Sequence, residues 1–139
     1  KLKKIIKTDF IVSNCDIILN INVHSLYTFH KSKNYDLTLV ASEKNVKIPY
    51  GSCLVKSNGT LKKIHEKPEI NYLANAGLYV IKHSVINLIP KNKEFNMDEL
   101  IKKMLKNKKK VGVFPINSEA WMDMGEWPEY NNTFNTFNK

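Results

Sequence analysis

Strand-like and helix-like runs alternate along almost the whole chain, and this alternation is the feature that most restricts its possible folds. In such chains helices cover the faces of a sheet, as in α/β domains. The sequence predicts helices at 22–32, 83–88, 96–107 and 126–134, strands at 9–13, 35–42, 47–56, 60–66, 76–82 and 110–116, and a short extended piece at 119–122. We therefore expect an α/β fold with a mixed, mainly parallel sheet flanked by helices.

Local signals support this assignment. Asn22 stands where it can cap the first helix, and Asn58-Gly59 between two strand patterns is typical of a hairpin turn. Pro68 follows Lys67, and the residue before a proline usually has an extended backbone. We therefore expect Lys67 to continue the second strand of that hairpin, with its ammonium at the end of the strand.

Composition limits the possible partners. The 139 residues suit one domain or part of one, and the net charge of +9 arises from 22 basic residues that are all Lys. Base-edge recognition relies on Arg, so we expect no nucleic-acid partner. No apolar run reaches the roughly 18 residues of a membrane span. Cys15 and Cys53 lack metal-ligand spacing and are predicted to be buried, reduced thiols of a cytoplasmic protein.

Two aspartates are candidate metal ligands. Asp16 directly follows a predicted strand, near the carboxyl end where open α/β sheets bind ligands. Asp123 lies between two methionines, where an unpaired carboxylate would need a hydrogen-bond donor or a cation. Each also has a simpler interpretation, because Asp16 suits a turn and Asp123 could cap the helix predicted at 126–134.

Four further residues are candidate ligand contacts. Glu66 could bind sugar hydroxyls and Lys67 a phosphate, although such a pair is more often simply exposed. Asn75 offers a donor and an acceptor in a small-residue segment that could equally be a plain turn. Gly51 interrupts a strand pattern, which indicates a bulge or a close approach of a ligand to the main chain.

The order and spacing of these segments resemble the carboxyl-terminal two-thirds of the sugar-1-phosphate nucleotidyltransferase family, and some details are similar to a bacterial subgroup with CBS domains. The resemblance covers about residues 10–130. The segments are Asn14-Cys15-Asp16, Pro49-Tyr50-Gly51, Glu66-Lys67-Pro68, Asn75-Ala76-Gly77-Leu78-Tyr79 and Trp121-Met122-Asp123-Met124-Gly125.

The resemblance implies a Rossmann-like fold and a role for each motif. Asp16 and Asp123 would bind Mg²⁺, Lys67 would hold the phosphate that attacks, and Glu66, Asn75 and the main chain at Gly51 would contact the sugar. The intact protein would transfer a nucleoside monophosphate from an NTP to a sugar-1-phosphate, giving an NDP-sugar and pyrophosphate. The resemblance also implies a role in sugar-nucleotide biosynthesis for cell-surface polysaccharides.

Two departures from the family pattern matter. Cys15 stands where the family has Gly, which changes the backbone freedom beside Asp16. The family's Gly-rich, Arg-containing nucleotide loop has no counterpart, because the five glycines are dispersed and Arg is absent. We therefore expect residues 1–139 to be a partial domain, with its N-terminal part missing and no second domain, that is inactive alone.

Other interpretations stay open. A metal-dependent glycosyltransferase would share the architecture, but it usually carries a close Asp-x-Asp pair, whereas here Asn14 stands two residues before Asp16. A non-catalytic sugar-nucleotide-sensing module would keep the pocket and lack the loop. The aromatic residues Tyr130, Phe134 and Phe137 could pack internally or support a homo-oligomer.

Overall fold

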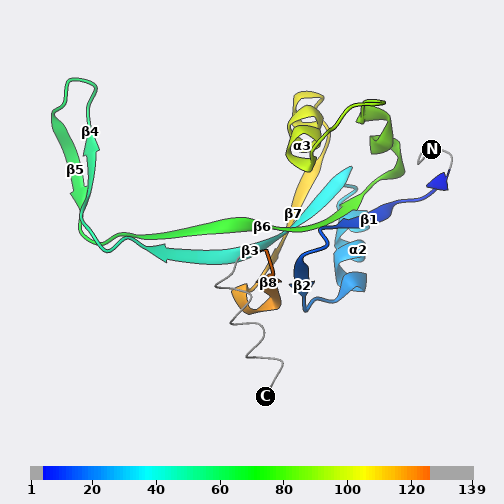
Figure 1. The fold of residues 1–139 in the computed structure, drawn as a ribbon, viewed down its shortest axis with the longest axis horizontal. Helices are drawn as coiled ribbons and strands as arrows, with labels where there is room; N and C mark the ends of the chain where they lie inside the picture. Colours follow the sequence, from blue (N-terminus) through cyan, green and yellow to red (C-terminus); the bar gives the residue numbers. More distant parts are fainter. Residues whose placement is uncertain (1–4, 126–139) are drawn as a thin grey trace, which may run out of the picture.

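A four-stranded mixed sheet with helices on both faces forms the body of the molecule (Figure 1). The structure, a computed structural model, describes residues 5–125. The elements are β1 (Phe10–Ser13), β2 (Ile17–Leu19), α2 (Val23–Ser32), β3 (Leu37–Lys47), β4 (Ser52–Val55), β5 (Leu61–His65), β6 (Glu69–Ile81), η1 (His83–Leu88), α3 (Met97–Lys106), β7 (Val111–Ile116), η2 (Ser118–Ala120) and β8 (Trp121–Asp123). The predicted α/β class with a mixed sheet flanked by helices is confirmed, but the sheet is not mainly parallel, because β6 is antiparallel to both of its neighbours.

The strand order is β1-β6-β3-β7, with β6 antiparallel to both of its neighbours and β7 parallel to β3. Strands β1, β3 and β7 therefore share one direction, while β6 runs against them. The connection between β3 and β6 explains their antiparallel pairing, because residues 48–68 return through the β4–β5 hairpin, whereas a parallel pair needs a crossover, usually a helix.

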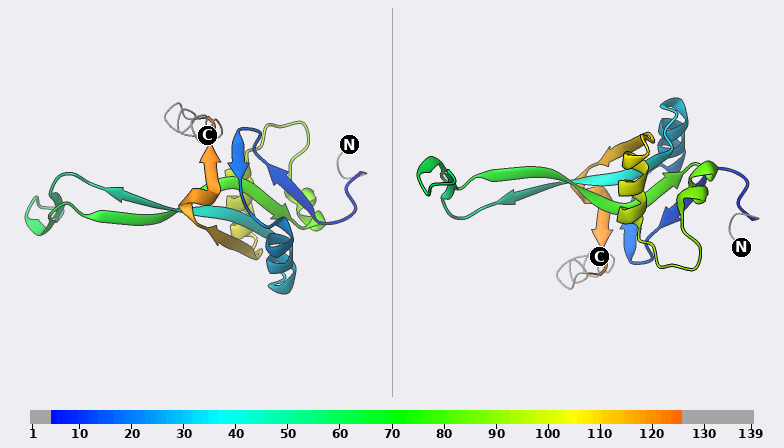
Figure 2. Two further views of the ribbon diagram at one scale, coloured as in Figure 1. Left: turned by 90° about the horizontal axis from the view of Figure 1, so that it is seen from below. Right: turned by 90° about the horizontal axis from the view of Figure 1, so that it is seen from above.

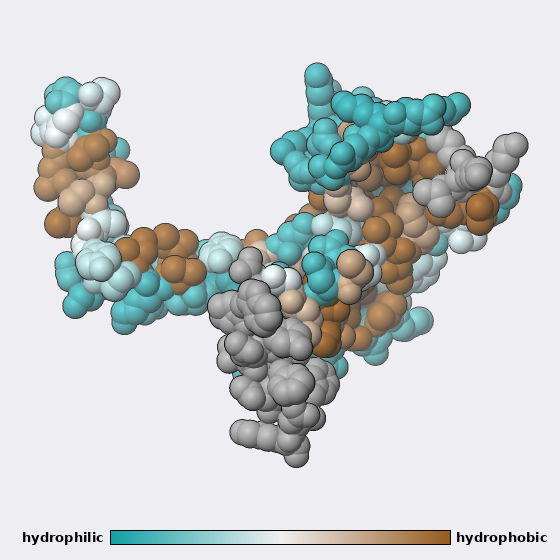
Figure 3. Space-filling view, viewed as in Figure 1, coloured by the Kyte–Doolittle hydropathy of each residue, from teal (hydrophilic) through white to brown (hydrophobic). Residues whose placement is uncertain are grey.

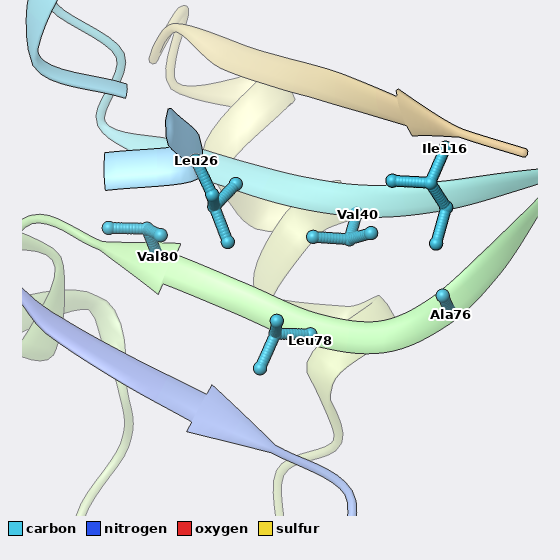
Figure 4. Close-up of a cluster of buried hydrophobic side chains, with 6 residues drawn as sticks. All are labelled: Leu26, Val40, Ala76, Leu78, Val80 and Ile116. Carbon is cyan, nitrogen blue, oxygen red and sulfur yellow. The ribbon is translucent and has the colours of Figure 1, made fainter. Parts of the chain in front are cut away.

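Each face of the sheet buries its own apolar cluster. Alternate residues of β6 point to opposite faces, as the two-residue period of a strand requires. Leu78 and Val80 pack with Leu26 on the face that α2 covers, whereas Tyr79 packs on the face that α3 covers. Figure 4 shows the first cluster, formed by Leu26, Val40, Ala76, Leu78, Val80 and Ile116.

Helix α2 begins and packs as its sequence predicts. The side chain of Asn22 accepts a hydrogen bond from the Ser25 amide at 3.0 Å, which satisfies one of the free donors of the first turn. Near its end, the buried ring of His30 bonds through Nδ1 to the buried hydroxyl of Thr38 on β3 at 2.9 Å. This polar contact fixes the helix against the sheet.

Strands β3 and β6 continue beyond the sheet as a two-stranded ribbon that leads into the β4–β5 hairpin (Figures 1 and 2). The sequence predicts shorter strands, 35–42 and 76–82, because apolar alternation stops there. The ladder nevertheless continues from Ser42–Ala74 to Lys47–Glu69. Without a covering layer, the hairpin leaves Leu54, Val55, Leu61 and Ile64 more than half exposed, and Figure 3 shows this apolar surface.

Several sequence predictions need correction. Cys15 and Cys53 are free but exposed, because one lies in a loop and the other on the uncovered hairpin. Lys67 has φ of 42°, so it turns the chain between β5 and β6 instead of extending β5. The segment predicted as extended at 119–122 divides into η2 and β8.

The helix predicted at 126–134, and with it Tyr130, Phe134 and Phe137, lies outside the described residues. Within residues 5–125, no helix is both long enough and apolar enough to cross a lipid bilayer.

Candidate functional site

The short strands β2 and β8 bring the two predicted metal ligands together. They pair antiparallel, with Ile17 opposite Asp123. The next residues continue the pairing, because the Met124 amide donates to the Asp16 carbonyl at 2.8 Å. Two aspartates that are more than a hundred positions apart in the sequence therefore lie on adjacent strand ends. The strand β2 that makes this possible is absent from the sequence prediction.

Both carboxylates face the same small space above Gly125. A Cβ atom built on Gly125 would lie 3.2 Å from Asp123 Oδ1 and 3.4 Å from Asp16 Oδ2. Asp123 Oδ1 also accepts the Gly125 amide at 2.9 Å, so its first partner is this turn. The absence of a side chain at Gly125 keeps the space between the carboxylates open.

The chemistry of this pair suits a hard cation that keeps part of its shell for a substrate. Within the described residues, no group of three or more His, Cys, Asp or Glu side chains is placed to hold a metal. Mg²⁺ usually takes one or two carboxylates and completes its shell with water and substrate phosphate. Asp16 and Asp123 therefore fit Mg²⁺ better than a closed structural metal site.

Asn75 lies beside this strand end, in a bulge of β6. The Asn14 amide donates to the Gly77 carbonyl at 2.9 Å, which ties the bulge to the segment that carries Asp16. The Asn75 amide is itself held from two sides: its Oδ1 accepts from the Gly77 amide at 3.1 Å, and its Nδ2 donates to the Tyr79 hydroxyl at 2.7 Å.

Gly51, Glu66 and Lys67 form a second group at the corner where the ribbon meets the hairpin. A Cβ on Gly51 would lie 3.1 Å from Glu66 Oε2, so the carboxylate rests over bare main chain. Lys67 Nζ lies 4.0 Å from Glu66 Oε1, and both side chains are mostly exposed.

The two groups are separated along the ribbon. Glu69 and Asn75 stand six positions apart on β6, which corresponds to roughly 20 Å of extended strand. Figures 1 and 2 show the same separation between the corner and the β2–β8 pair. In this arrangement, Lys67 and the aspartates can contact one sugar phosphate only if the ribbon bends toward β8.

A groove of about 860 Å³ lies between the ribbon and the end of β7. None of the predicted site residues lines it. Its lining includes Lys44, whose ammonium stands 4.7 Å above the ring of Trp121, the first residue of β8. Sequence reasoning misses this groove because it depends on how far the ribbon extends past the sheet. Its lining is Glu43, Lys44, Asn45, Asn71, Tyr72, Leu73, Pro115 and Ser118.

A buried polar cluster under α2 carries the main electrostatic perturbations. Burial lowers the pKa of His30 from its usual 6.5, and the nearby Asp9 carboxylate opposes this only in part. Burial alone would raise the pKa of Asp9, but hydrogen bonds from Lys31 Nζ and the His83 amide hold it below 3.8. Because His30 and Thr38 are fully buried, we assign this cluster a structural role.

Comparison with known proteins gives one family. The family described as nucleotidyl transferase matches residues 2–139. A putative mannose-1-phosphate guanyltransferase of Sulfolobus acidocaldarius is 33% identical over 124 residues, covering 88% of this chain and 33% of its own length. A mannose-1-phosphate guanyltransferase 2 of Candida glabrata is 33% identical over 132 residues, covering 89% and 36%. The chain thus spans about a third of the curated relatives that it matches.

Solved structures share the fold. HddC from Yersinia pseudotuberculosis, complexed with GMP-PN, has a TM-score of 0.63 at 22% identity, over 98% of this chain and 58% of that one. The UTP-bound UGPase from Acinetobacter baumannii has a TM-score of 0.64 at 17% identity, over 97% and 53%. At these identities the likeness concerns the fold.

Proposed function

Because this chain belongs to the nucleotidyl transferase family, we propose that it forms the metal-binding and sugar-phosphate-binding half of a sugar-1-phosphate nucleotidyltransferase. The proposed reaction transfers a nucleoside monophosphate from an NTP to a sugar-1-phosphate and releases pyrophosphate. The observation that carries this proposal is the convergence of Asp16 and Asp123 on the space above Gly125. The names of the relatives support a hexose phosphate such as mannose-1-phosphate as substrate.

In the proposed site, Asp16 and Asp123 hold Mg²⁺ and Asn75 contacts the sugar. Bound Mg²⁺ would neutralise charge on the phosphate oxygens and orient them. The nucleophile is a phosphate oxygen that is already anionic, so no side chain has to remove a proton. The work of this chain is then to position substrates and to compensate charge, which can supply a large part of the rate enhancement in such reactions.

The corner residues are proposed as further substrate contacts. Lys67 is the proposed phosphate ligand, and Glu66 and the main chain at Gly51 are proposed sugar contacts. Support comes from their proximity and from the bare backbone under Glu66. Lys67→Ala would weaken binding of a sugar-1-phosphate if the corner takes part, and would leave it unchanged if the carboxylate group binds alone.

The family match favours the transferase over the glycosyltransferase alternative. The sensing alternative predicts ligand binding without turnover even when the nucleotide loop is supplied. A cytoplasmic location, a role in cell-surface polysaccharide synthesis and a homo-oligomeric assembly stay predictions from the sequence.

Calorimetry tests the proposed function directly. Mannose-1-phosphate should bind this chain more tightly with Mg²⁺ than without it, and Asp16→Asn or Asp123→Asn should remove the Mg²⁺-dependent part. Asp98→Asn is the matched control, because Asp98 is an exposed carboxylate on α3 that pairs with Lys102. The proposal would be overturned if the affinity for mannose-1-phosphate were the same with and without Mg²⁺, or if neither aspartate substitution changed the Mg²⁺-dependent part.

A further inference from the structure

Tyr79 has a polar contact that its packing does not require. Its ring is buried on the α3 side of the sheet, and the residue is only 4% exposed. A Phe would fill the same space. The hydroxyl, however, accepts a hydrogen bond from Asn75 Nδ2 at 2.7 Å. The oxygen atom therefore links the apolar core to a residue at the candidate site.

This contact exists only because β6 is bulged. In a regular strand, residues four apart are separated by about 13 Å. Here Tyr79 pairs with Leu39 and Asn75 with Ala41, so β6 has two more residues than β3 over this stretch. Gly77, with φ of 77°, turns the intervening backbone back and brings the two side chains into contact.

The surrounding donors fix the orientation of the Asn75 amide. The Gly77 N–H can only donate, so the atom that faces it at 3.1 Å must be the Asn75 oxygen. The nitrogen then faces the Tyr79 hydroxyl. With these two bonds made, Asn75 keeps one N–H donor and one oxygen lone pair, which is the complement that a sugar hydroxyl needs.

We propose that Tyr79 is a positioning residue for sugar recognition, whose hydroxyl holds the Asn75 amide with its free donor and acceptor toward the ligand. This inference rests on the proposed function, because it takes Asn75 as a sugar contact. The bulge is tied to the strand end that carries Asp16 through the bond from Asn14 to Gly77.

The first test needs no ligand. In the NMR spectrum of the ligand-free chain, Tyr79→Phe should shift the side-chain amide signal of Asn75 and speed its exchange with water. Tyr72→Phe is the matched control, because Tyr72 is a half-exposed tyrosine of the same strand. An Asn75 signal that is unchanged by Tyr79→Phe would overturn the inference.

The second test measures binding of mannose-1-phosphate with Mg²⁺ present. Loss of one neutral hydrogen bond predicts that Tyr79→Phe weakens binding about fivefold. Asn75→Ala should weaken it at least as much, and adding Tyr79→Phe to Asn75→Ala should have no further effect, since the hydroxyl acts only through Asn75.

The outcomes separate the two proposals. A loss of the same size in the Asn75→Ala background would mean that Tyr79 acts through packing, which contradicts a positioning role. Equal binding by wild type and Tyr79→Phe would also overturn that role. If the wild-type chain does not bind mannose-1-phosphate, the proposed function fails, and the amide signal still decides whether Tyr79 orients Asn75.

Discussion

Gly77 holds the β6 bulge in a conformation that few other residues tolerate. Its φ of 77° lies in the left-handed region, and a Cβ there would stand 2.8 Å from Asn14 Nδ2. Backbone freedom and close approach are therefore both required at this one position. Gly77 donates to Asn75 and accepts from the Asn14 backbone, so its conformation sets the positions of both asparagines at the candidate site.

Gly77→Ala should lower the free energy of unfolding by about 1–3 kcal/mol from its backbone conformation, with a further loss from the contact with Asn14. Urea unfolding measures the change. Gly59→Ala is the control, because Gly59 has φ of 82° but nothing within 4 Å of the added methyl group. Equal losses for the two variants would contradict the crowding at Asn14.

His30 gives stability a pH dependence of defined sign. The pKa of His30 is lower in the folded chain than its usual 6.5. Between the folded and the unfolded pKa, the unfolded chain therefore binds more protons than the folded chain. The contribution of neutral His30 to the free energy of unfolding should be complete above about pH 6.5 and should decrease as the pH falls from 6.5 toward the folded pKa of His30. His30→Asn should flatten this part of the profile in urea unfolding at pH 7.5 and 5.5. A profile unchanged by the substitution would exclude His30 as its source.

At the scale of elements, the described part of the chain divides into a packed body and an uncovered arm. Helices α2 and α3 bury apolar residues of both sheet faces, whereas the β4–β5 hairpin has no covering layer. A two-stranded hairpin without a packed face is marginally stable in water. We expect the global free energy of unfolding to depend on packing in the body and to be insensitive to substitutions in the arm.

A pair of leucines tests this division. Leu26→Ala on α2 removes a fully buried side chain and should cost about 3 kcal/mol. Leu54→Ala on β4 removes a half-exposed one and should change stability by less than about 0.5 kcal/mol. Thermal and urea unfolding measure both variants. A cost for Leu54→Ala close to that of Leu26→Ala would mean that the arm is packed in solution.

The sequence predicts elements well where periodicity and local chemistry agree. Asn22 caps α2, Asn58-Gly59 turns the hairpin, and Leu100 and Met104 of the predicted helix 96–107 pack on the sheet. Two features escape it for physical reasons. Strand β2 has three residues, too few for a period, and it forms because β8 pairs with it. The polar half of β3 has no apolar alternation and is held by its ladder with β6.

The relative positions of the candidate site residues are only partly predictable from the sequence. The resemblance to the nucleotidyltransferase family implies that Asp16 and Asp123 converge, and the β2–β8 pair brings them together. The extended backbone predicted for Lys67 is wrong. The turn into β6 requires a left-handed conformation at this residue, which the usual preference before proline does not predict. The separation of the corner from the carboxylates depends on ribbon length, which local sequence does not set.

At the scale of the whole molecule, the chain carries the proposed acidic and polar ligands but no Arg and no glycine cluster for a triphosphate. We therefore predict that the 139-residue chain, with NTP, mannose-1-phosphate and Mg²⁺, releases no pyrophosphate above the uncatalysed rate. A coupled phosphate assay measures this. Turnover by the chain alone would show that other residues grip the nucleotide.

The proposed function depends on one divalent ion that Asp16 and Asp123 share. Mn²⁺ can replace Mg²⁺ in NMR titrations of the chain, because its unpaired electrons broaden signals nearby. We predict that the amide signals of Ile17 and Gly125 broaden together, that excess Mg²⁺ restores them, and that Asp16→Asn or Asp123→Asn abolishes both effects. Broadening of only one signal, or broadening that survives either substitution, would contradict a shared site.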